Sequence, residues 1–497
     1  MTDKPNIVFI LIDDMGWKDL SCTGSLFYET PNIDRLAAEG MRFTNAYASC
    51  PVCSPSRASV LTGKYPATVG VTDYIDWNGG YHPARGRLID VPYIKQLPQC
   101  EYTLASALKD NGYSTWHVGK WHLGGSGSLP QDHGFDVNIG GCEVGAPYGG
   151  GYFSPWSLPP LQDAEVPDGT YLTDYLTDRA VDLIHQDHDA PFFLNMWYYS
   201  VHEPIEAKPE KIRKYEAKAE AMGLHKQDTF EEGESFNTER MKHQRIRRRL
   251  VQSDPVYAAM IESLDENVGR LLDALEASGK AENTIVIFTS DNGGLATAES
   301  SPTCNAPLAE GKGWMYEGGT REPLLVKWTD HVAPGSICSV PVTTPDFYPT
   351  FLEAARADLI PEQHCDGVSL VPLLKGGDEL PRKAIFWHYP HYGNQGGTPG
   401  SSVRVGNYKL IEFFEDNRIE LYDLENDPGE KHDLSQEKPE LAREMKATLW
   451  QWRQDVEAKI PQPNPDWGGN SSGTGVAGAL LRSPSFEGHA GASSLTR

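Results

Sequence analysis

The sequence predicts an α/β fold: a large central sheet, mostly parallel but mixed, sandwiched by helices, with a smaller C-terminal subdomain of antiparallel strands and one helix. Apolar runs of strand length alternate with helical patterns along most of the chain, which is typical of parallel sheets covered by helices. The 497 residues also exceed the roughly 250–300 residues at which a single core stops growing. We therefore expect two structural units.

The first elements are predicted by the stretches NIVFILIDDMGW and TPNIDRLAAEG. Residues 7–12 are apolar without interruption, as in a parallel strand buried on both faces. The second stretch is a short helix in which Thr30 is the N-cap, Pro31 lies in the first turn and Gly40 is the stop.

Further strands are predicted at 114–118, 192–198 and 284–288. From about residue 381 the pattern changes to short alternating strands and a final helix at 439–460. The helix before the strand at 284–288 has one apolar face, formed by Ile261, Leu264, Val268, Leu271 and Leu275.

We divide the chain into a main α/β domain over residues 1–380, a C-terminal subdomain over 381–460 and a flexible, Gly/Ser-rich tail over 461–497. Within the main domain, residues 205–255 contain KPEKIRKYEAKAEAMG and RIRRR and are predicted to be a charged helical insertion. This insertion is either a solvated face or a set of basic residues beside a cleft that receives an anionic glycan.

Composition excludes several classes of protein. The 69 acidic residues outnumber the 44 basic ones, which argues against nucleic-acid binding because phosphate contacts need clustered Lys and Arg. No run approaches the roughly 18 apolar residues of a membrane span, and the first apolar stretch has only a strand's length, so we expect no signal peptide in this chain. The protein is then cytoplasmic as written, or periplasmic or secreted if a signal has been removed. Eight cysteines are too sparse for a disulfide-built scaffold, and we expect most to be buried thiols.

Side chains that can bind a ligand or transfer a proton follow each predicted strand. Asp13 and Asp14 follow the first strand, and other acids, amides, lysines and histidines follow the later ones. Because open α/β sheets bind ligands beyond the carboxyl ends of their strands, we expect these side chains to meet. Carboxylate and amide oxygens suit a hard cation, Ca²⁺ or Mg²⁺, rather than Zn²⁺. The later side chains are Lys120, His122, His202, Asp291 and Asn292.

The stretch CPVCSPSRASVLTG, residues 50–63, contains a C-x-x-C pair, and no other such pair occurs in the chain. A structural zinc site needs a second pair of ligands, and a thioredoxin-type pair needs a small βαβ domain. The string from Cys53 to Arg57, Cys-x-Pro-Ser-Arg leading into LTG, instead resembles the signature of the type I (formylglycine-dependent) sulfatases of the alkaline phosphatase superfamily. The stretches GKWHLG, DNGG, GKGWMYEGGTREP and RVGNYKLIEFF resemble the same family, most closely its bacterial carbohydrate sulfatases, over about residues 5–460.

The resemblance implies that Cys53 is oxidised to formylglycine by a formylglycine-generating or radical maturation enzyme. A hydrated aldehyde has two hydroxyls: one can attack sulfur and form a covalent sulfate ester, and the other can then lose its proton and expel sulfate. Cys50 has no role in the signature and is predicted to be a small core residue.

The resemblance also assigns roles to the other side chains. Asp13, Asp14, Asp291 and Asn292 match the metal ligands, with the diol at position 53 completing the shell. Arg57 holds the diol, Lys120 and Lys312 clamp sulfate oxygens, His122 deprotonates the hemiacetal hydroxyl and His202 protonates the departing sugar oxygen.

Substrate recognition is predicted in the loops TDYIDWNGG (72–80) and WHYPHYGNQGG (387–397), whose aromatic and polar side chains can stack on sugar rings and bond hydroxyls. They resemble loops of exo-acting sulfatases for 4-sulfated galactose or N-acetylgalactosamine, although aromatic loops also pack as ordinary core. Two other functions stay open: a phosphodiester or phosphonate monoester hydrolase, and a non-catalytic, metal-stabilised glycan-binding protein. The candidate selectors are Asp73, Asp76, His388, His391 and Arg404.

Overall fold

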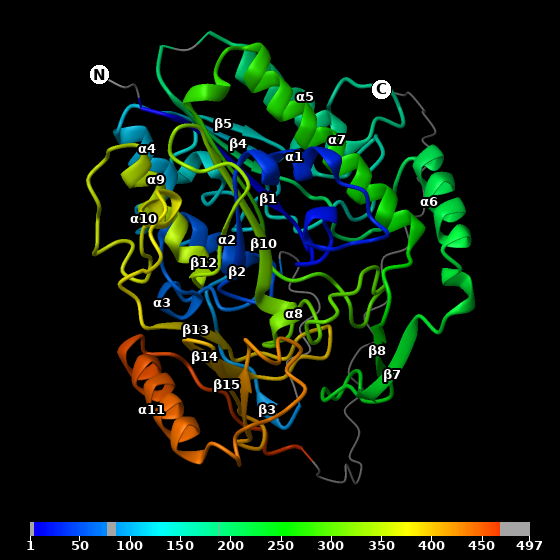
Figure 1. Cartoon of the computed structure of the whole chain (residues 1–497), viewed down its shortest axis with the longest axis vertical. Coiled ribbons are helices and arrows are strands. Elements are labelled where there is room, and N and C mark those ends of the chain that lie inside the picture. Colours follow the sequence, from blue (N-terminus) through cyan, green and yellow to red (C-terminus); the bar gives the residue numbers. More distant parts are fainter. Residues whose placement is uncertain (1–3, 77–85, 188, 468–497) are drawn as a thin grey trace, which may run out of the picture. The chain divides into compact units, whose positions relative to one another are not determined.

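A nine-stranded mixed sheet lies at the centre of the computed structural model, which describes residues 4–76, 86–187 and 189–467 (Figure 1). The strand order is β11-β2-β10-β9-β1-β6-β4-β5, and β12 pairs with β2. Only β10 runs antiparallel to its neighbours, which confirms the predicted mixed sheet. The strands are β1 (Asn6–Ile12), β2 (Met41–Tyr47), β4 (Ser114–Gly119), β5 (Val137–Ile139), β6 (Phe192–Trp197), β9 (Thr284–Ser290), β10 (Arg321–Trp328), β11 (Ser336–Cys338) and β12 (Val342–Thr343).

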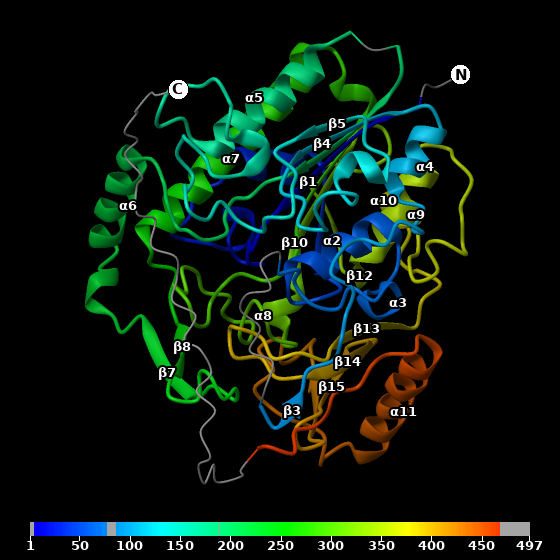
Figure 2. The ribbon, with the colours of Figure 1, turned by 180° about the vertical axis from the view of Figure 1, so that it is seen from behind.

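Helices cover both faces of this sheet, as Figures 1 and 2 show from opposite sides. Alternate residues of β1 point to different cores, because side chains alternate along a strand. Val8, Ile10 and Ile12 pack with α1 (Pro31–Glu39), α5 (Leu172–His185) and α7 (Pro255–Ala277). Ile7, Phe9 and Leu11 pack with α2 (Cys53–Thr62), α4 (Leu104–Asp110), α9 (Phe347–Ala354) and α10 (Val371–Leu374).

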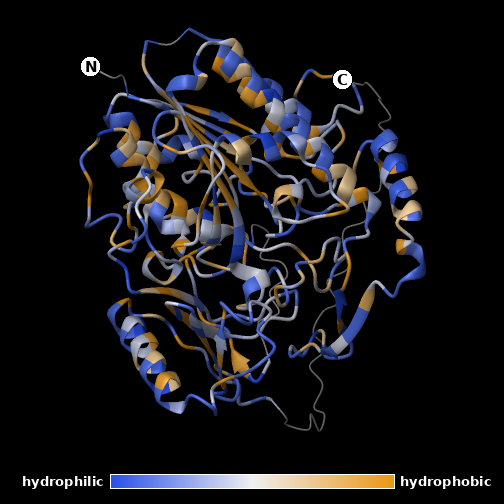
Figure 3. Cartoon of the chain, viewed as in Figure 1, coloured by the Kyte–Doolittle hydropathy of each residue, from blue (hydrophilic) through white to orange (hydrophobic). Residues whose placement is uncertain are grey.

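The amphipathic patterns agree with this layering. In Figure 3 the central strands are largely hydrophobic, whereas α5 and α7 carry both hydrophobic and hydrophilic residues. The α1 helix begins after Thr30 and ends before Gly40, as predicted. Short elements connect the layers: α3 (Pro66–Val69), α8 (Glu317–Thr320) and the 3-10 turns Ser21–Thr23, Pro130–His133, Pro159–Leu161, Leu224–Lys226, Ala281–Asn283 and Thr344–Asp346.

A second, antiparallel sheet follows residue 381, in the order β13-β14-β15-β16. One face packs against α11 (Pro439–Asp455) through Leu410 and Leu449. The other face packs Trp387 against Cys50, which confirms Cys50 as a buried core residue. The strands are β13 (Ala384–Tyr389), β14 (Gly400–Val405), β15 (Tyr408–Phe413) and β16 (Ile419–Asp423). The chain through Asn464 is one compact unit, so position 380 marks a change of sheet rather than the end of a separate body.

Two predicted helices differ from the structure. The helix expected at 439–460 ends at Asp455, because Glu457 adopts a left-handed φ of 51° and the Ala458 N–H donates to the Arg453 carbonyl, which closes the helix. The insertion at 205–255 contains α6 (Pro209–Ala221) and the short 3-10 turn at Leu224–Lys226, and β7 (Phe230–Ser235) and β8 (Arg245–Arg249) then form a hairpin.

The hairpin forms because RIRRR has the period of a strand. Ile246 is buried between the exposed Arg245 and Arg247, and the Arg247 guanidinium lies 3.6 Å from the centroid of the Phe230 ring. A helix would not place these side chains on opposite faces. The prediction of a helix over RIRRR was therefore wrong.

The predicted tail is ordered at its start. β17 (Gln462–Pro463) pairs with β3 (Leu88–Ile89), and the Asn464 side chain donates to the Gly86 carbonyl at 3.0 Å. Residues 468–497 of the tail, and residues 77–80 of the predicted loop 72–80, lie outside the described residues. Among the helices that the structure describes, none has the length and apolarity needed to cross a membrane.

All eight cysteines are free thiols in the described chain. Five of them are buried, as expected, whereas Cys100 and Cys365 are exposed and Cys22 is half-buried.

Candidate active site

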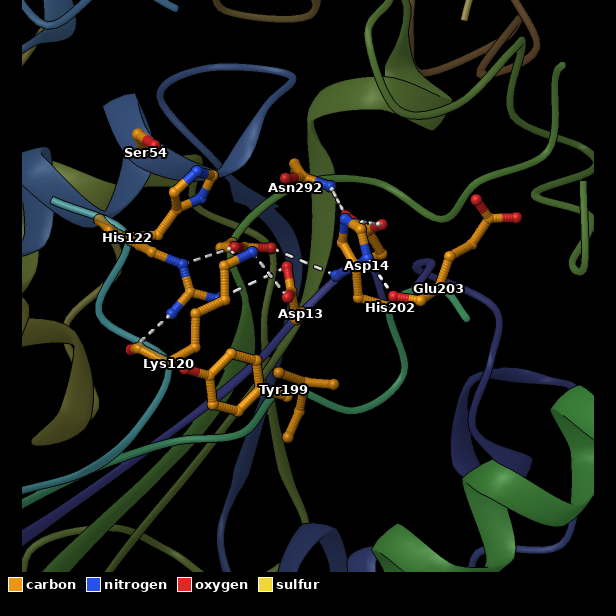
Figure 4. A network of polar contacts seen from close by, with 12 residues as sticks. Asp13, Asp14, Ser54, Lys120, His122, Tyr199, His202, Glu203 and Asn292 are labelled. Atoms are coloured by element: carbon orange, nitrogen blue, oxygen red, sulfur yellow. Dashed lines mark hydrogen bonds and ion pairs between the residues drawn. The ribbon is translucent and has the colours of Figure 1, made fainter. Parts of the chain in front are cut away.

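The predicted side chains meet at one edge of the central sheet. Asp13 follows β1, Lys120 follows β4 and Asp291 follows β9, each directly after the last residue of its strand. His202 lies in the loop after β6. Figure 4 shows Asp13, Asp14, His202 and Asn292 gathered together.

Buried carboxylates and cations pair closely here. The Lys120 Nζ donates to Asp13 Oδ2 at 2.7 Å, and the Lys312 Nζ donates to Asp14 Oδ2 at 2.7 Å. The Arg57 Nη2 lies 2.7 Å from Asp291 Oδ2. All these groups are buried, so each charge depends on its partner.

Cys53 is the first residue of α2 and is only 2% exposed. The amino end of a helix favours an anion, because its first N–H groups and its dipole point outward. Arg57, one turn later, is fixed by Asp291, by a hydrogen bond from Nη1 to the Lys120 carbonyl (3.3 Å) and by the Trp197 ring. The thiol position therefore lies beside fixed positive charge.

The unmodified thiol is poorly suited to attack. Burial raises the pKa of Cys53 to about 12, although Lys120 and Lys312 oppose the shift. Because only the thiolate is nucleophilic, an unmodified Cys53 is almost entirely inactive at neutral pH.

The acidic groups are suited to a divalent cation. Burial raises the pKa of Asp13 to about 7 despite the Lys120 ammonium, whereas at Asp14 the effect of burial is outweighed by Lys312, His202 and Lys120, which lower the pKa. Asn292 donates its Nδ2 to Asp14 Oδ1 at 2.8 Å, and this orients its buried Oδ1, which accepts no hydrogen bond from the described residues.

One donor atom from each of Asp13, Asp14, Cys53 and His202 lies within 4.8 Å of the others. The oxygens of this set, from Asp13 and Asp14 with the oriented Asn292 oxygen, fit a hard cation, whereas the Cys53 sulfur and the His202 nitrogen are softer donors. The sequence prediction placed His202 among the catalytic groups and did not anticipate that its ring nitrogen lies among the candidate ligand atoms.

The two histidines differ in their available nitrogens. The His122 Nε2 lies 2.8 Å from the Ile75 carbonyl, which can only accept, so Nε2 carries the proton and the buried Nδ1 is left as an acceptor without a partner among the described residues. Burial lowers the pKa of His122 well below 6.5. His122 is therefore a neutral group that can accept a proton.

His202 is placed between two charged groups. Its Nδ1 lies 2.9 Å from the Glu203 carbonyl, and its Nε2 lies 3.0 Å from the Lys312 Nζ and 3.5 Å from Asp14 Oδ2. Burial and the Lys312 ammonium lower its pKa to about 3. Despite the burial of Lys312, Asp14 raises its pKa well above 10.5, so the Lys312 ammonium keeps its proton and donates a hydrogen bond to the neutral His202 ring.

A pocket of about 240 Å³ opens onto these groups. Cys53, His122, His202 and Lys312 are among the residues that line it. The described part of its lining also includes Tyr74, Asp76, Tyr148, Glu299, Asn394 and Gln395. The pocket thus has cationic and imidazole groups near Cys53, and aromatic, amide and acidic groups elsewhere on its wall.

Only Asp76 of the five predicted selectors is found in the described pocket lining. Asp73 is buried and accepts from the Tyr389 hydroxyl at 3.0 Å, so it fixes a loop. His388 is held by the Ser401 hydroxyl and the Lys459 carbonyl.

The other two candidate selectors, His391 and Arg404, also form their contacts inside the protein. His391 lies 2.9 Å from the Thr72 hydroxyl and also contacts Asp90. Arg404 contacts the Tyr47 hydroxyl and donates to the Gly406 carbonyl at 2.9 Å. These positions correct the prediction, because the strand β14 and the loop at 390–391 direct the side chains into the protein.

Sequence reasoning did not single out several of the lining residues. Asn394 and Gln395 lie in the loop 387–397 that was expected to bind substrate, but its histidines were chosen instead. Tyr148 lies in a Gly-rich stretch and Glu299 in a polar loop. No motif or periodic pattern in the sequence marks Tyr148 or Glu299, because only the tertiary structure brings these residues close to Cys53.

A mixed sheet with acids, lysines and a helix-terminal cysteine at one edge resembles the ester hydrolases of the alkaline phosphatase superfamily, and the comparisons with known proteins agree with this class. The profile of the Sulfatase family matches residues 5–357, and that of the N-sulphoglucosamine sulphohydrolase C-terminal region matches residues 310–455. The chain therefore belongs to the Sulfatase family and is a sulfuric ester hydrolase.

Known proteins resemble it over most of their length. A Formosa agariphila protein named sulfatase is 33% identical over 550 aligned residues, covering 93% of each chain. Human N-acetylgalactosamine-6-sulfatase is 30% identical, covering 92% of this chain and 86% of its own. The structure of Ps i-CgsB in complex with k-i-k-neocarrahexaose matches with a TM-score of 0.71 at 29% identity, covering 94% of this chain and 95% of that one.

Proposed function

We propose that this protein hydrolyses a sulfate ester on the terminal sugar of an oligosaccharide, using formylglycine derived from Cys53 and a divalent cation, Ca²⁺ or Mg²⁺. The observation that carries the proposal is the position of Cys53 at the amino end of α2, where Lys312, His122 and His202 line the same pocket. An anion-binding lysine and two histidines thus surround one modifiable side chain.

The modification explains how a buried residue 53 can be a nucleophile. Hydrated formylglycine supplies one hydroxyl for attack on sulfur and a second whose deprotonation releases sulfate. The His122 Nδ1 accepts the proton of that second hydroxyl, because the ring is neutral and this nitrogen has no hydrogen-bond partner within the described chain.

The lysines bind the sulfate group. Lys312 and Lys120 lie beside the acids and near Cys53, and their charges, with the α2 amino end, favour a tetrahedral anion. Arg57 holds position 53 and offsets the charge that develops there. A cation held by Asp13, Asp14, Asp291 and Asn292 supplies Lewis-acid polarisation.

His202 protonates the departing sugar oxygen. Lys312 lowers the pKa of His202 in the free protein, and a sulfate ester paired with Lys312 offsets that charge. The pKa of His202 then rises when substrate binds, which suits a general acid.

A carbohydrate substrate is supported by the pocket wall and by the relatives. Tyr74 and Tyr148 offer aromatic surface, and Asp76 and Asn394 offer polar groups of the kind that bind sugars. Among related proteins, one structure holds D-glucosamine-2-N,6-O-disulfate as its substrate, at 25% identity and a TM-score of 0.69.

Galactose or N-acetylgalactosamine 4-sulfate remains our first candidate substrate. Several mammalian relatives are named N-acetylgalactosamine-6-sulfatase, so the 6-sulfate of the same sugar is the first competitor to test.

The test joins mass spectrometry with sulfate release. We expect formylglycine at position 53 in the peptide spanning residues 50–57, and sulfate release from N-acetylgalactosamine 4-sulfate or 6-sulfate that exceeds the turnover of a phosphodiester or a phosphonate monoester. Faster phosphodiester turnover would identify the alternative hydrolase.

Two cysteine variants provide the matched control. Cys53→Ala should lose sulfate release by at least about a thousandfold, whereas Cys50→Ala, three residues away in the core, should retain it. Full turnover by Cys53→Ala would contradict the proposed nucleophile, and intact sugar binding without any turnover would indicate the non-catalytic function.

A further inference from the structure

Glu299 occupies an unusual position in the pocket wall. Its φ of 49° is left-handed, as are those of Ala298 (57°) and Ser301 (42°), and none of these residues is glycine. A left-handed φ costs free energy in a residue with a Cβ, so surrounding contacts must hold this loop in place.

The β7–β8 hairpin supplies those contacts. The Ala298 N–H donates to the Arg247 carbonyl at 3.2 Å, the Arg249 N–H donates to the Ala296 carbonyl at 2.9 Å, and the Arg249 side chain donates to the Ser301 carbonyl. Ala298 packs with Ile246 of β8. The hairpin is thus a support for the pocket wall rather than only a solvated face.

Neighbouring loops fix the Glu299 side chain. The Gln395 Nε2 donates to Glu299 Oε1 at 2.9 Å, and the Gln395 carbonyl in turn accepts from Trp314 Nε1 at 3.0 Å. The Ser300 N–H donates to Glu203 Oε1 at 3.1 Å, which ties the loop to the residue after His202.

Glu299 keeps one acceptor for a ligand. Its Oε2 makes no hydrogen bond to any residue that the structure describes, and the residue is exposed where the pocket opens. A carboxylate only accepts hydrogen bonds, so it fits a hydroxyl and repels a second anion. Although the residue as a whole is exposed, the pocket wall shields its carboxylate from bulk water and raises its pKa to about 7; Lys312 opposes the shift, and the group is largely ionised in mildly alkaline solution.

We propose that Glu299 determines specificity: its carboxylate accepts hydrogen bonds from hydroxyls of the sugar that carries the sulfate, and it excludes sugars with a second sulfate or a carboxylate at that position. This inference rests on the proposed carbohydrate sulfatase function. It assigns the sulfate to the lysine side of the pocket and a neutral part of the sugar to the Glu299 side.

The experiment uses competition at pH 8. Inhibition of 4-nitrophenyl sulfate turnover is measured with N-acetylgalactosamine 4-sulfate, its 6-sulfate and its 4,6-disulfate, for the wild type and for Glu299→Gln. The wild type should bind the better monosulfated sugar at least about tenfold more tightly than the disulfated sugar, because like charges in a pocket are poorly screened. Glu299→Gln keeps the shape and the bond from Gln395, and should reduce that ratio about tenfold.

Glu232→Gln is the matched control. It makes the same chemical change on β7 of the same hairpin, at a side chain that is 76% exposed, and should leave the ratio unchanged. If Glu299→Gln does not fold, the test is the wild-type ratio between binding of the monosulfated sugar and binding of the disulfated sugar, and equal binding of the two overturns the proposal.

Failure of this inference differs from failure of the proposed function. Release of sulfate from the sugars with equal binding of mono- and disulfated forms, or with a ratio unaffected by Glu299→Gln, overturns the role of Glu299 alone. Turnover of the aryl sulfate without sulfate release from, or competition by, any sugar overturns both.

Discussion

At the scale of single residues, the site depends on side chains that neutralise one another in the interior. Asp13, Asp14 and Asp291 are each paired with a buried cation, Lys120, Lys312 or Arg57. An isolated buried charge is strongly destabilising, so these residues must be varied with substitutions that keep their volume.

We predict that Asp291→Asn loses bound divalent cation and nearly all sulfatase activity. The substitution removes a charged oxygen ligand while retaining the size of the side chain. Elemental analysis and sulfate release measure the two effects. Asp273→Asn, on the exposed face of α7, should retain both, and wild-type activity that survives thorough chelation with no detectable ion would contradict the metal's role.

Gly145 sets the position of the His122 ring. A Cβ at Gly145 would lie 2.6 Å from His122 Cε1, closer than atoms in contact allow. We predict that Gly145→Ala displaces the ring and lowers kcat by about 10²-fold, because small displacements of a catalytic group are costly. The control glycine must have a φ that alanine can adopt, which excludes Gly112 because its φ of 86° is left-handed. Gly125→Ala, where the nearest atom is 3.4 Å away, should leave kcat within about threefold of wild type.

At the scale of secondary-structure elements, parallel strands explain why segments distant in sequence meet. β1, β4, β6 and β9 all end at the same edge, so the loops after them share one region. The insertion hairpin supports the loop at 296–301, which contributes Glu299 to the pocket wall beside this region.

We predict that Ile246→Ala loosens that wall. Ile246 is 1% exposed and packs with Phe236, Ala298 and Trp314, and such a truncation removes about 2–4 kcal/mol of packing free energy. KM for a sugar sulfate should rise severalfold more than KM for 4-nitrophenyl sulfate. Arg245→Ala, exposed on the same strand, is the control, and an equal rise in KM on both substrates would limit the hairpin to a general structural role.

At the scale of the whole molecule, a buried ionic cluster joins the C-terminal sheet to the main sheet region. The Lys409 Nζ of β15 lies 3.0 Å from both Glu317 Oε1 and Glu430 Oε1. One lysine cannot neutralise two carboxylates. Burial raises the pKa of Glu430 to about 7, and Lys409 only partly opposes this shift. Burial also acts on Glu317, but there Lys409 and Arg321 outweigh it and lower the pKa of Glu317.

This cluster predicts a dependence of stability on pH. In the folded chain Glu430 keeps its proton up to about pH 7, whereas in the unfolded chain it loses it near pH 4.5. The folded state therefore binds more protons between these values, and the contribution of Glu430 to stability falls as pH rises from about 4.5 through 7. Between pH 5 and pH 8 the Tm of the wild type should fall by a few degrees more than that of Glu430→Gln. Parallel Tm curves for the two proteins would contradict the shift.

The sequence alone determined the layers of the main sheet and singled out most of the side chains that meet in the candidate active site. The run at β1, the caps of α1 and the apolar face of α7 are local features, because periodicity and capping act within a few residues. The side chains around Cys53 were also predictable, since a string of adjacent residues and the ends of strands mark them.

Only the tertiary structure decided the pocket wall. His388, His391 and Arg404 are polar residues in a suitable loop or strand, but hydrogen bonds to distant partners direct them inward. Tyr148, Glu299 and Gln395 face Cys53 because segments far apart in the chain pack together. Packing between distant segments leaves no periodic pattern in the sequence, so the centre of this enzyme could be predicted from local signals and its specificity could not.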